Sequence, residues 1–271
     1  MAAMVVSRPT LRWIARIGFI GRGIVFLILG GLALWAALGG GTQPVGTSGA
    51  LNRVISQPAG ALLALAIAIG LLCFAALRVV EAVSDVYDYG DDWHGIAQRA
   101  SLGAAGIFYT GLGIAAASIV LAGRYAPNND QQVRDWTAWA LSMPFGAWLV
   151  GIAGGITVVI GLGLATAGLR GKFKTRLRLH EKGGRVVTLL GVIGFLARSV
   201  VFVLIGSFLI FAAFTADPKH AQGFGGALRA LRDQPYGNVL LITAAAGLLA
   251  FGIFGVAEAH YGRAARLGTA R

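Results

Sequence analysis

Six apolar runs divide the chain at nearly regular intervals, and short polar segments separate them. Each run supplies the roughly 20 apolar residues that a helix needs to cross the hydrocarbon core of a bilayer. The pattern therefore predicts an all-α integral membrane protein with six transmembrane helices. The predicted helices cover residues 17–38, 59–82, 100–122, 145–169, 187–214 and 236–257.

The first, third and fifth of these helices are versions of one another. The sequence GFIGRGIVFLILG of residues 18–30 aligns without a gap with GFLARSVVFVLIG of residues 194–206. A weaker copy, residues 105–113, aligns with residues 22–30. Repetition over such a period is the signature of a repeat architecture.

The second, fourth and sixth helices repeat as well, because each opens with a proline that is followed two residues later by a glycine. Proline suits the first turn of a helix, where its missing N–H has no partner in any case. A short amphipathic segment precedes each proline and is expected to lie along the outer membrane surface. The Pro/Gly pairs are Pro58 and Gly60, Pro144 and Gly146, and Pro235 and Gly237, and the amphipathic segments are 49–54, 136–141 and 226–231.

The unit that repeats is thus a helical hairpin with a short outer interfacial helix. We expect three such repeats, residues 12–85, 97–169 and 186–262. Each repeat crosses the membrane an even number of times, so all three should share one orientation. They are then parallel repeats rather than the inverted repeats of several alternating-access transporters.

These motifs resemble a bacterial family called domain of unknown function 1206. The resemblance rests on the Ala-Arg-x-Gly-Phe-x-x-Arg-Gly-x-x-Phe pattern that begins at Ala15 and on the Gln-Pro-x-Gly pattern at Gln57 and Gln234. It covers nearly the whole chain and implies a multi-pass membrane protein of two-helix repeats. The family has no settled activity, so the resemblance implies no catalytic residues. The middle repeat departs from the pattern, with Ala105 in place of the arginine and Met143 in place of the glutamine.

Composition supports the membrane assignment. Apolar residues make up 56% of the chain and charged residues 13%, about half the usual share in a soluble domain. The single cysteine, Cys73, cannot form an internal disulfide. A net charge of +12 would suggest nucleic acid in a soluble protein, but here the cations lie between apolar runs. Membrane topology and anionic lipid explain them better, and no nucleic-acid partner is expected.

Lys and Arg residues concentrate on the side of the membrane that holds both termini. The positive-inside rule therefore predicts a protein of the bacterial plasma membrane with cytoplasmic N- and C-termini. The densest cationic segment follows the fourth helix and is predicted to bind anionic lipid headgroups at the cytoplasmic face, although topology alone also accounts for it. Its cations are Arg170, Lys172, Lys174, Arg176, Arg178, Lys182 and Arg185.

Two arginines, Arg22 and Arg198, lie inside predicted helices and need partners, because a central arginine costs about 2.5–3.5 kcal/mol to insert. Glu81 and Glu258 are the candidates, since they occupy the same position in the second and sixth helices. We therefore expect two intramembrane Arg–Glu contacts, either within a hairpin or crossing to the other charged repeat.

The middle repeat has alanines at both positions, Ala105 and Ala167. Joint loss of both charges is what an ion pair predicts. The contacts could be structural clasps or could line a proton or ion pathway, or the arginines could extend to lipid headgroups.

The fourth helix is rich in glycine, and Gly151 and Gly155 share a face with Ala147. Such a face of small residues fits either a homo-oligomer interface or tight packing inside the monomer. The four histidines lack metal-ligand spacing, and we expect neither a metal site nor a cofactor.

The function favoured by these residues is a non-catalytic structural or lipid-interacting membrane component. The alternative is a small-solute or ion permease with intramembrane Arg/Glu pairs. A membrane enzyme comes third, because the chain offers no nucleophile with an orienting base.

Overall fold

The computed structural model describes residues 8–40, 43–57, 60–84, 90, 92–122, 129–171 and 181–262, and in these residues it is all-helical with no strand. The long helices are α1 (Arg8–Ala37), α3 (Gly60–Val83), α4 (Trp93–Ala122), α6 (Gly146–Leu169), α7 (Glu181–Thr215) and α9 (Gly237–Tyr261). The short helices are α2 (Thr47–Ile55), α5 (Asn129–Leu141) and α8 (Phe224–Arg232), and a 3₁₀ turn, η2, covers Pro218–His220.

The six long helices confirm the predicted membrane helices. Their apolar spans are 24 to 32 residues long, with mean hydropathy between 1.4 and 2.6, and each is therefore long and apolar enough to cross a bilayer. The short helices α2, α5 and α8 lie at the predicted places in the three repeats, and α5 contacts both α2 and α8.

A shared turn explains the Pro-x-Gly motif. The amide of Gly146 donates to the Met143 carbonyl at 2.9 Å, and the amide of Gly237 donates to the Gln234 carbonyl at 2.8 Å. The residue after each proline has a left-handed backbone, with φ of 63° at Phe145 and 62° at Tyr236. Pro144 and Pro235 therefore occupy the second position of a β-turn that precedes the helix, rather than the first helical turn that the sequence suggested.

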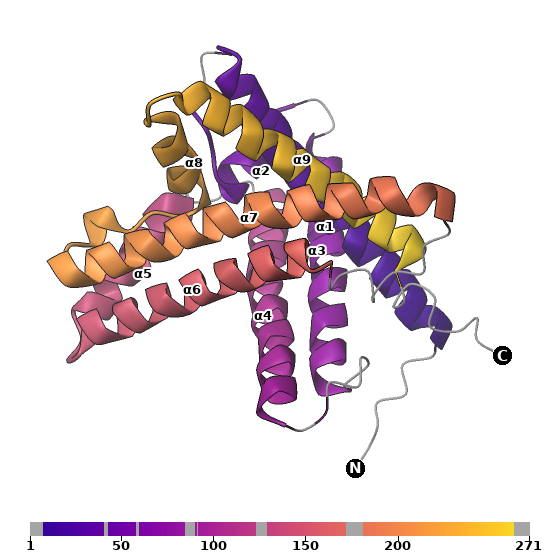
Figure 1. Ribbon diagram of the computed structural model, residues 1–271, viewed down its shortest axis with the longest axis horizontal. Helices are drawn as coiled ribbons and strands as arrows, with labels where there is room; N and C mark the ends of the chain where they lie inside the picture. Colours follow the sequence, from indigo (N-terminus) through magenta and orange to yellow (C-terminus); the bar gives the residue numbers. More distant parts are fainter. Residues whose placement is uncertain are drawn as a thin grey trace.

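The long helices form three antiparallel pairs, α1 with α9, α3 with α4 and α6 with α7, which run in three directions (Figure 1). Each pair joins the second long helix of one repeat to the first long helix of the next, and α9 closes onto α1. The pairs meet through α1 with α3 and through α7 with α9, whereas α4 and α6 have no comparable packing contact. The closest packing thus crosses the boundaries of the predicted hairpins.

Equivalent small residues make these pairs possible. A Cβ atom built on Gly30 would lie 2.8 Å from Leu249, and one built on Gly206 would lie 2.7 Å from Val158. In the third pair the same contact joins Gly113 to Leu72, at 2.8 Å. The partner stands 12 residues after the glycine that begins its helix in all three cases. The three repeats therefore share one interface, and small residues let the backbones approach closely.

In the first and third repeats, the two long helices of the hairpin pack against each other through a second contact that the middle repeat lacks. A Cβ atom on Gly18 would lie 2.6 Å from the Phe74 backbone, and the equivalent Gly194 packs on Phe251 in the third repeat. The corresponding middle positions are Ser101 and Ile160, which are both exposed. Ile156 is also exposed at the position where α3 has Gly70, which approaches Gly21. A branched side chain in place of glycine prevents that approach, so α4 and α6 stay apart.

Candidate functional site

The charged residues singled out in the sequence come from the four helices that join the three pairs. Arg22 lies on α1, Glu81 on α3, Arg198 on α7 and Glu258 on α9. Apart from Arg198, which is half-buried, all are buried, with at most 6% of each residue exposed. Charge at such a depth needs a partner, because an isolated buried ion is strongly disfavoured.

The Arg22 guanidinium donates through Nη2 to the Glu258 carboxylate. This ion pair joins the first repeat to the third, across the α1–α9 interface. Of the two arrangements that the sequence left open, the structure has the one that crosses between repeats. The side chains are 6% and 8% exposed, so the pair is sealed from its surroundings.

Glu81 forms its ion pair with Arg78, one turn earlier on the same helix, at 2.5 Å between Nη1 and Oε2. Arg78 is not among the intramembrane charges predicted from the sequence. The repeat comparison gives no signal for it, because the equivalent residues are Leu164 and Gly255. The i,i+3 spacing to Glu81 was the signal available, since residues three apart are neighbours on a helix surface.

Three arginines alternate with two phenylalanine rings, and we call this set the arginine–phenylalanine ladder. The Arg78 guanidinium lies 4.6 Å from the centroid of Phe74, and Arg22 lies 4.8 Å from the same ring. Arg22 is also 4.9 Å from Phe251, which Arg198 approaches at 4.6 Å. Desolvated cation–π contacts contribute about 2 kcal/mol each. The ladder therefore connects α3, α1, α9 and α7 through one continuous set of contacts.

Arg198 is the end of the ladder without a carboxylate at salt-bridge distance in the described part of the chain. Its guanidinium also lies 5.0 Å from Phe26 and 5.3 Å from Phe202, and its buried Nε has no hydrogen-bond partner. Glu258, the partner that the sequence suggested, is bound to Arg22. The three guanidiniums of the ladder thus have two carboxylate partners, Glu258 for Arg22 and Glu81 for Arg78.

The repeat symmetry explains why Arg198 differs from Arg22. Because the observed ion pair crosses the α9–α1 interface, its equivalents are Ala105 with Glu81 and Arg198 with Ala167. The two alanines of the middle repeat therefore belong to two different contacts and not to one lost pair. Each alanine leaves one charge without its symmetric partner; Glu81 has Arg78 instead, and Arg198 has the aromatic rings.

A second charged cluster joins the short helices. Asp130 of α5 is 1% exposed, and its Oδ1 accepts the amides of Gly223 and Gly226 at 2.9 and 3.0 Å, at the start of α8. Its Oδ2 forms an ion pair with Arg229, whose Nη1 donates to the Pro44 carbonyl at 3.2 Å. A carboxylate at a helix N-terminus is favourable, and this one links all three repeats.

The remaining predicted residues are more dispersed. A Cβ atom on Gly151 would lie 3.6 Å from Ala213 on α7, whereas one on Gly155 would have nothing within 4 Å. Arg170, at the C-terminus of α6, and Arg185, on α7, are exposed. The Lys182 side chain and all of Lys172, Lys174, Arg176 and Arg178 lie outside the described residues.

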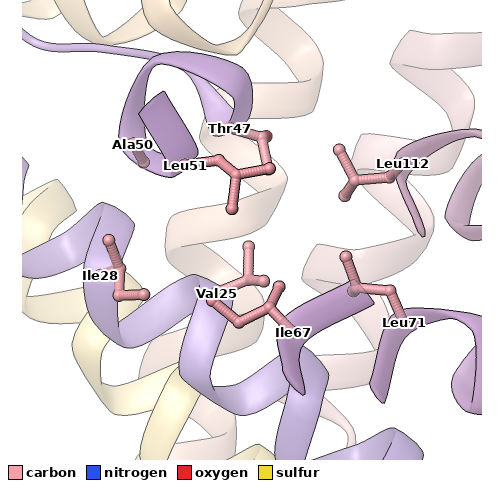
Figure 2. A pocket seen from close by; sticks show the side chains of 8 residues that line it. All are labelled: Val25, Ile28, Thr47, Ala50, Leu51, Ile67, Leu71 and Leu112. Atoms are coloured by element: carbon pink, nitrogen blue, oxygen red, sulfur yellow. The ribbon is translucent and has the colours of Figure 1, made fainter. Parts of the chain in front are cut away.

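Two cavities adjoin the short helix α2, and neither has a ladder residue in its lining. The first has room for about one water molecule, about 10 Å³. Its apolar lining is shown in Figure 2 and comprises Val25, Ile28, Thr47, Ala50, Leu51, Ile67, Leu71 and Leu112. The second is an open hollow of about 400 Å³ lined by Ile28, Leu32, Trp35, Arg53, Ser56 and Gln57. Within the described residues, no group of three His, Cys, Asp or Glu could hold a metal ion.

Comparison with known proteins confirms the resemblance seen in the sequence. The model of the family described as Domain of Unknown Function (DUF1206) matches residues 17–85, 100–171 and 193–262, one match for each repeat. An uncharacterized protein, YxxB of Bacillus subtilis (strain 168), is 31% identical over 258 residues, which are 94% of this chain and 92% of the relative. No solved structure matches the chain.

Proposed function

The chain belongs to the family described as Domain of Unknown Function (DUF1206), and on that premise we propose that it is a non-catalytic structural component of the membrane. The observation that carries the proposal is the sealed Arg22–Glu258 pair, flanked by Phe74 and Phe251. A group that moves ions or protons must exchange with them, whereas a group that holds helices together works best when enclosed. The enclosure of this pair supports the second role.

Lipid contact is part of the proposal. The six long helices are apolar enough to cross a bilayer, which supports contact between their exposed faces and acyl chains. The exposed Arg170 and Arg185 are the first and last cations of the cationic segment. Attraction to anionic headgroups contributes about 1 kcal/mol for each cation near the surface. We propose the bacterial plasma membrane as the location, with both termini in the cytoplasm, because the excess of Lys and Arg lies on their side.

One double variant separates a structural role from a permease. Arg22→Met with Glu258→Met removes both charges while it retains apolar bulk in the interface. In a strain that lacks the native protein, this variant should restore the wild-type membrane phenotype as well as the unaltered chain does. In proteoliposomes, neither form should carry protons, potassium or small organic anions faster than protein-free vesicles.

The control is Arg22→Met alone, which leaves the Glu258 carboxylate buried without its partner and should restore the phenotype less well than the double variant. Saturable flux through the wild-type protein that the double variant abolishes would identify a permease instead. Failure of a correctly inserted, stably folded double variant to restore the phenotype would also contradict the structural role.

A further inference from the structure

Arg22 and Arg198 occupy the same position in the first and third repeats, but the helix paired with each of them presents different residues. Arg22 faces Glu258 of the helix that packs against α1. In the equivalent helix pair α7 packs against α6, whose residue at the position of Glu258 is Ala167. The helix paired with α7 therefore lacks two groups that α9 gives to Arg22: Ala167 stands in place of the Glu258 carboxylate, and Ile160 in place of the Phe251 ring.

The backbones around the two arginines match closely enough for this comparison. Near Arg22, a Cβ atom on Gly252 would lie 2.9 Å from the Gly23 carbonyl oxygen. Near Arg198, a Cβ atom on Gly161 would lie 3.1 Å from the Ser199 carbonyl oxygen. Gly161 and Gly252 are equivalent, as are Ser199 and Gly23. Ala167 thus stands toward Arg198 as Glu258 stands toward Arg22.

The charges around Arg198 favour an added anion. Arg198 is within electrostatic reach of the Arg22 and Arg78 guanidiniums, the Glu258 carboxylate and the Tyr109 hydroxyl. The two neighbouring cations repel it, and Glu258 is already bound to Arg22. Aromatic rings offset part of this repulsion, but they supply no oxygen acceptor for its guanidinium N–H groups.

The Ala167 side of the site is close to the surface and to the end of the membrane span. Arg198 and Ala167 are both half-buried, and the neighbouring Thr166 and Leu169 of α6 are exposed. Ala167 lies three residues before Arg170, the C-cap residue that follows α6. A headgroup at this end of the helix pair is therefore within a turn or two of the site.

We propose that the Arg198 guanidinium binds a phosphate group beside Ala167, in the position that the Glu258 carboxylate takes beside Arg22. The planar fork of arginine N–H donors matches phosphate oxygens as it matches a carboxylate. The phosphate is carried by a lipid headgroup or is free in solution. This site goes beyond the structural role proposed above, which does not depend on it.

The test is thermal unfolding of the full-length protein in maltoside micelles at constant ionic strength, so that screening does not change. The additions are phosphatidylglycerol, an uncharged glycolipid with the same acyl chains, and inorganic phosphate in place of chloride. One of the two phosphate sources should raise the unfolding temperature of the wild-type protein by several degrees relative to the glycolipid or to chloride. A shift with the lipid alone identifies a headgroup, and a shift with inorganic phosphate identifies a free anion.

Ala167→Glu is the decisive variant, because it supplies the carboxylate from within the chain. It should unfold at a higher temperature than the wild-type protein without phosphate and should lose the phosphate-dependent shift. Thr166→Glu is the matched control, since it adds the same charge one residue away on an exposed position and should keep the shift. Arg198→Met, which removes the cation but retains apolar bulk, should also lose it.

Two results would overturn the site. One is the absence of a shift with both phosphate sources in the wild-type protein, or an equal shift with the glycolipid. The other is a shift that persists unchanged in folded Arg198→Met protein. The comparison of the wild-type protein with Arg198→Met does not depend on whether Ala167→Glu folds.

Discussion

A buried ion pair such as Arg22–Glu258 stabilises a protein less than its Coulomb energy suggests, because both ions lose their hydration on burial. In this chain the pair is accompanied by Phe74 and Phe251, which contact the same guanidinium. Removal of one ion leaves the other unpaired among these apolar groups, whereas removal of both leaves none. The loss of a single ion should therefore destabilise the protein more than the loss of the whole pair.

The effects of removing the two ions should therefore be strongly non-additive. Arg22→Met and Glu258→Met should each lower the free energy of unfolding by about 3–5 kcal/mol, and the double variant by much less than their sum. Unfolding in mixed micelles, followed by tryptophan fluorescence, measures all three. A double variant as impaired as the sum of the single variants would show that the two groups act independently.

The carboxylate of Asp130 gives a second prediction at the residue scale. Asp130→Asn removes the charge that Arg229 and the start of α8 bind, and should lower the free energy of unfolding by about 1.5–3 kcal/mol. Asp135→Asn is the matched control on the same helix, because Asp135 is exposed and contacts only a neighbouring glutamine in the described interactions. Equal effects of the two variants would rule out a special role for Asp130.

At the scale of the helix, packing is decided by where each glycine lies. Gly154 and Gly161 of α6, seven residues apart, both approach the backbone of α7. Gly155 and Gly163 of the same helix have open space around their Cβ positions. The composition of α6 is therefore less informative than the face on which each glycine stands.

Substitution of two glycines should separate these roles. A Cβ atom on Gly206 would lie 2.7 Å from the Gly154 carbonyl oxygen, so Gly206→Ala should force α6 and α7 apart and cost about 1–3 kcal/mol of stability. Gly163→Ala meets no atom within 4 Å and should be neutral or slightly stabilising. Thermal unfolding in detergent compares the two. A Gly206→Ala protein as stable as Gly163→Ala would show that the interface can relax.

At the scale of the whole molecule, three equivalent helix pairs could meet in three places, which we call corners. Two of these corners are packed and the third is not. The closed corners are α1 with α3 and α7 with α9, and the pair that would close the third corner is α4 with α6. The arginine–phenylalanine ladder runs through both closed corners, from Arg78 on α3 to Arg198 on α7. Ile160, the middle-repeat equivalent of Phe74 and Phe251, is exposed instead.

Disulfide cross-linking in membranes tests this arrangement, and the Cys73→Ala variant provides a cysteine-free background. Leu72→Cys with Gly113→Cys should cross-link readily, because these residues meet between α3 and α4. Ala104→Cys with Ile156→Cys should not, although the equivalent Gly21 and Gly70 are in contact in the first repeat. Rapid cross-linking of residues 104 and 156 would show that the middle hairpin is closed.

Hydrophobicity predicted the apolar parts of the helices but not their polar ends. The third span was expected from residue 100, yet α4 begins at Trp93 and includes two polar turns. Arg99 in these turns donates to the Ala82 carbonyl of α3 at 2.9 Å, a tertiary contact to which a hydropathy pattern is insensitive. Asp130 escaped notice for the same reason, since its partners at the start of α8 come close only when the helices are in place, whereas the i,i+3 spacing of Arg78 and Glu81 could be read in the sequence.

The sequence by itself determined the six apolar helices, their threefold repetition and the charges that lie inside them, because bilayer thickness sets a run length and duplication leaves matching residues. Only the tertiary structure decided that Arg22 meets Glu258, that Glu81 meets Arg78 and that Arg198 stacks on phenylalanine. Equivalent positions in the three repeats have the same depth and lie on the same helix face. From the sequence alone, an arginine of one repeat could therefore pair with the glutamate of either charged repeat. The choice among copies is made only in the folded protein, where Glu81 is bound by Arg78 of its own helix and Arg22 binds Glu258 across the α1–α9 interface.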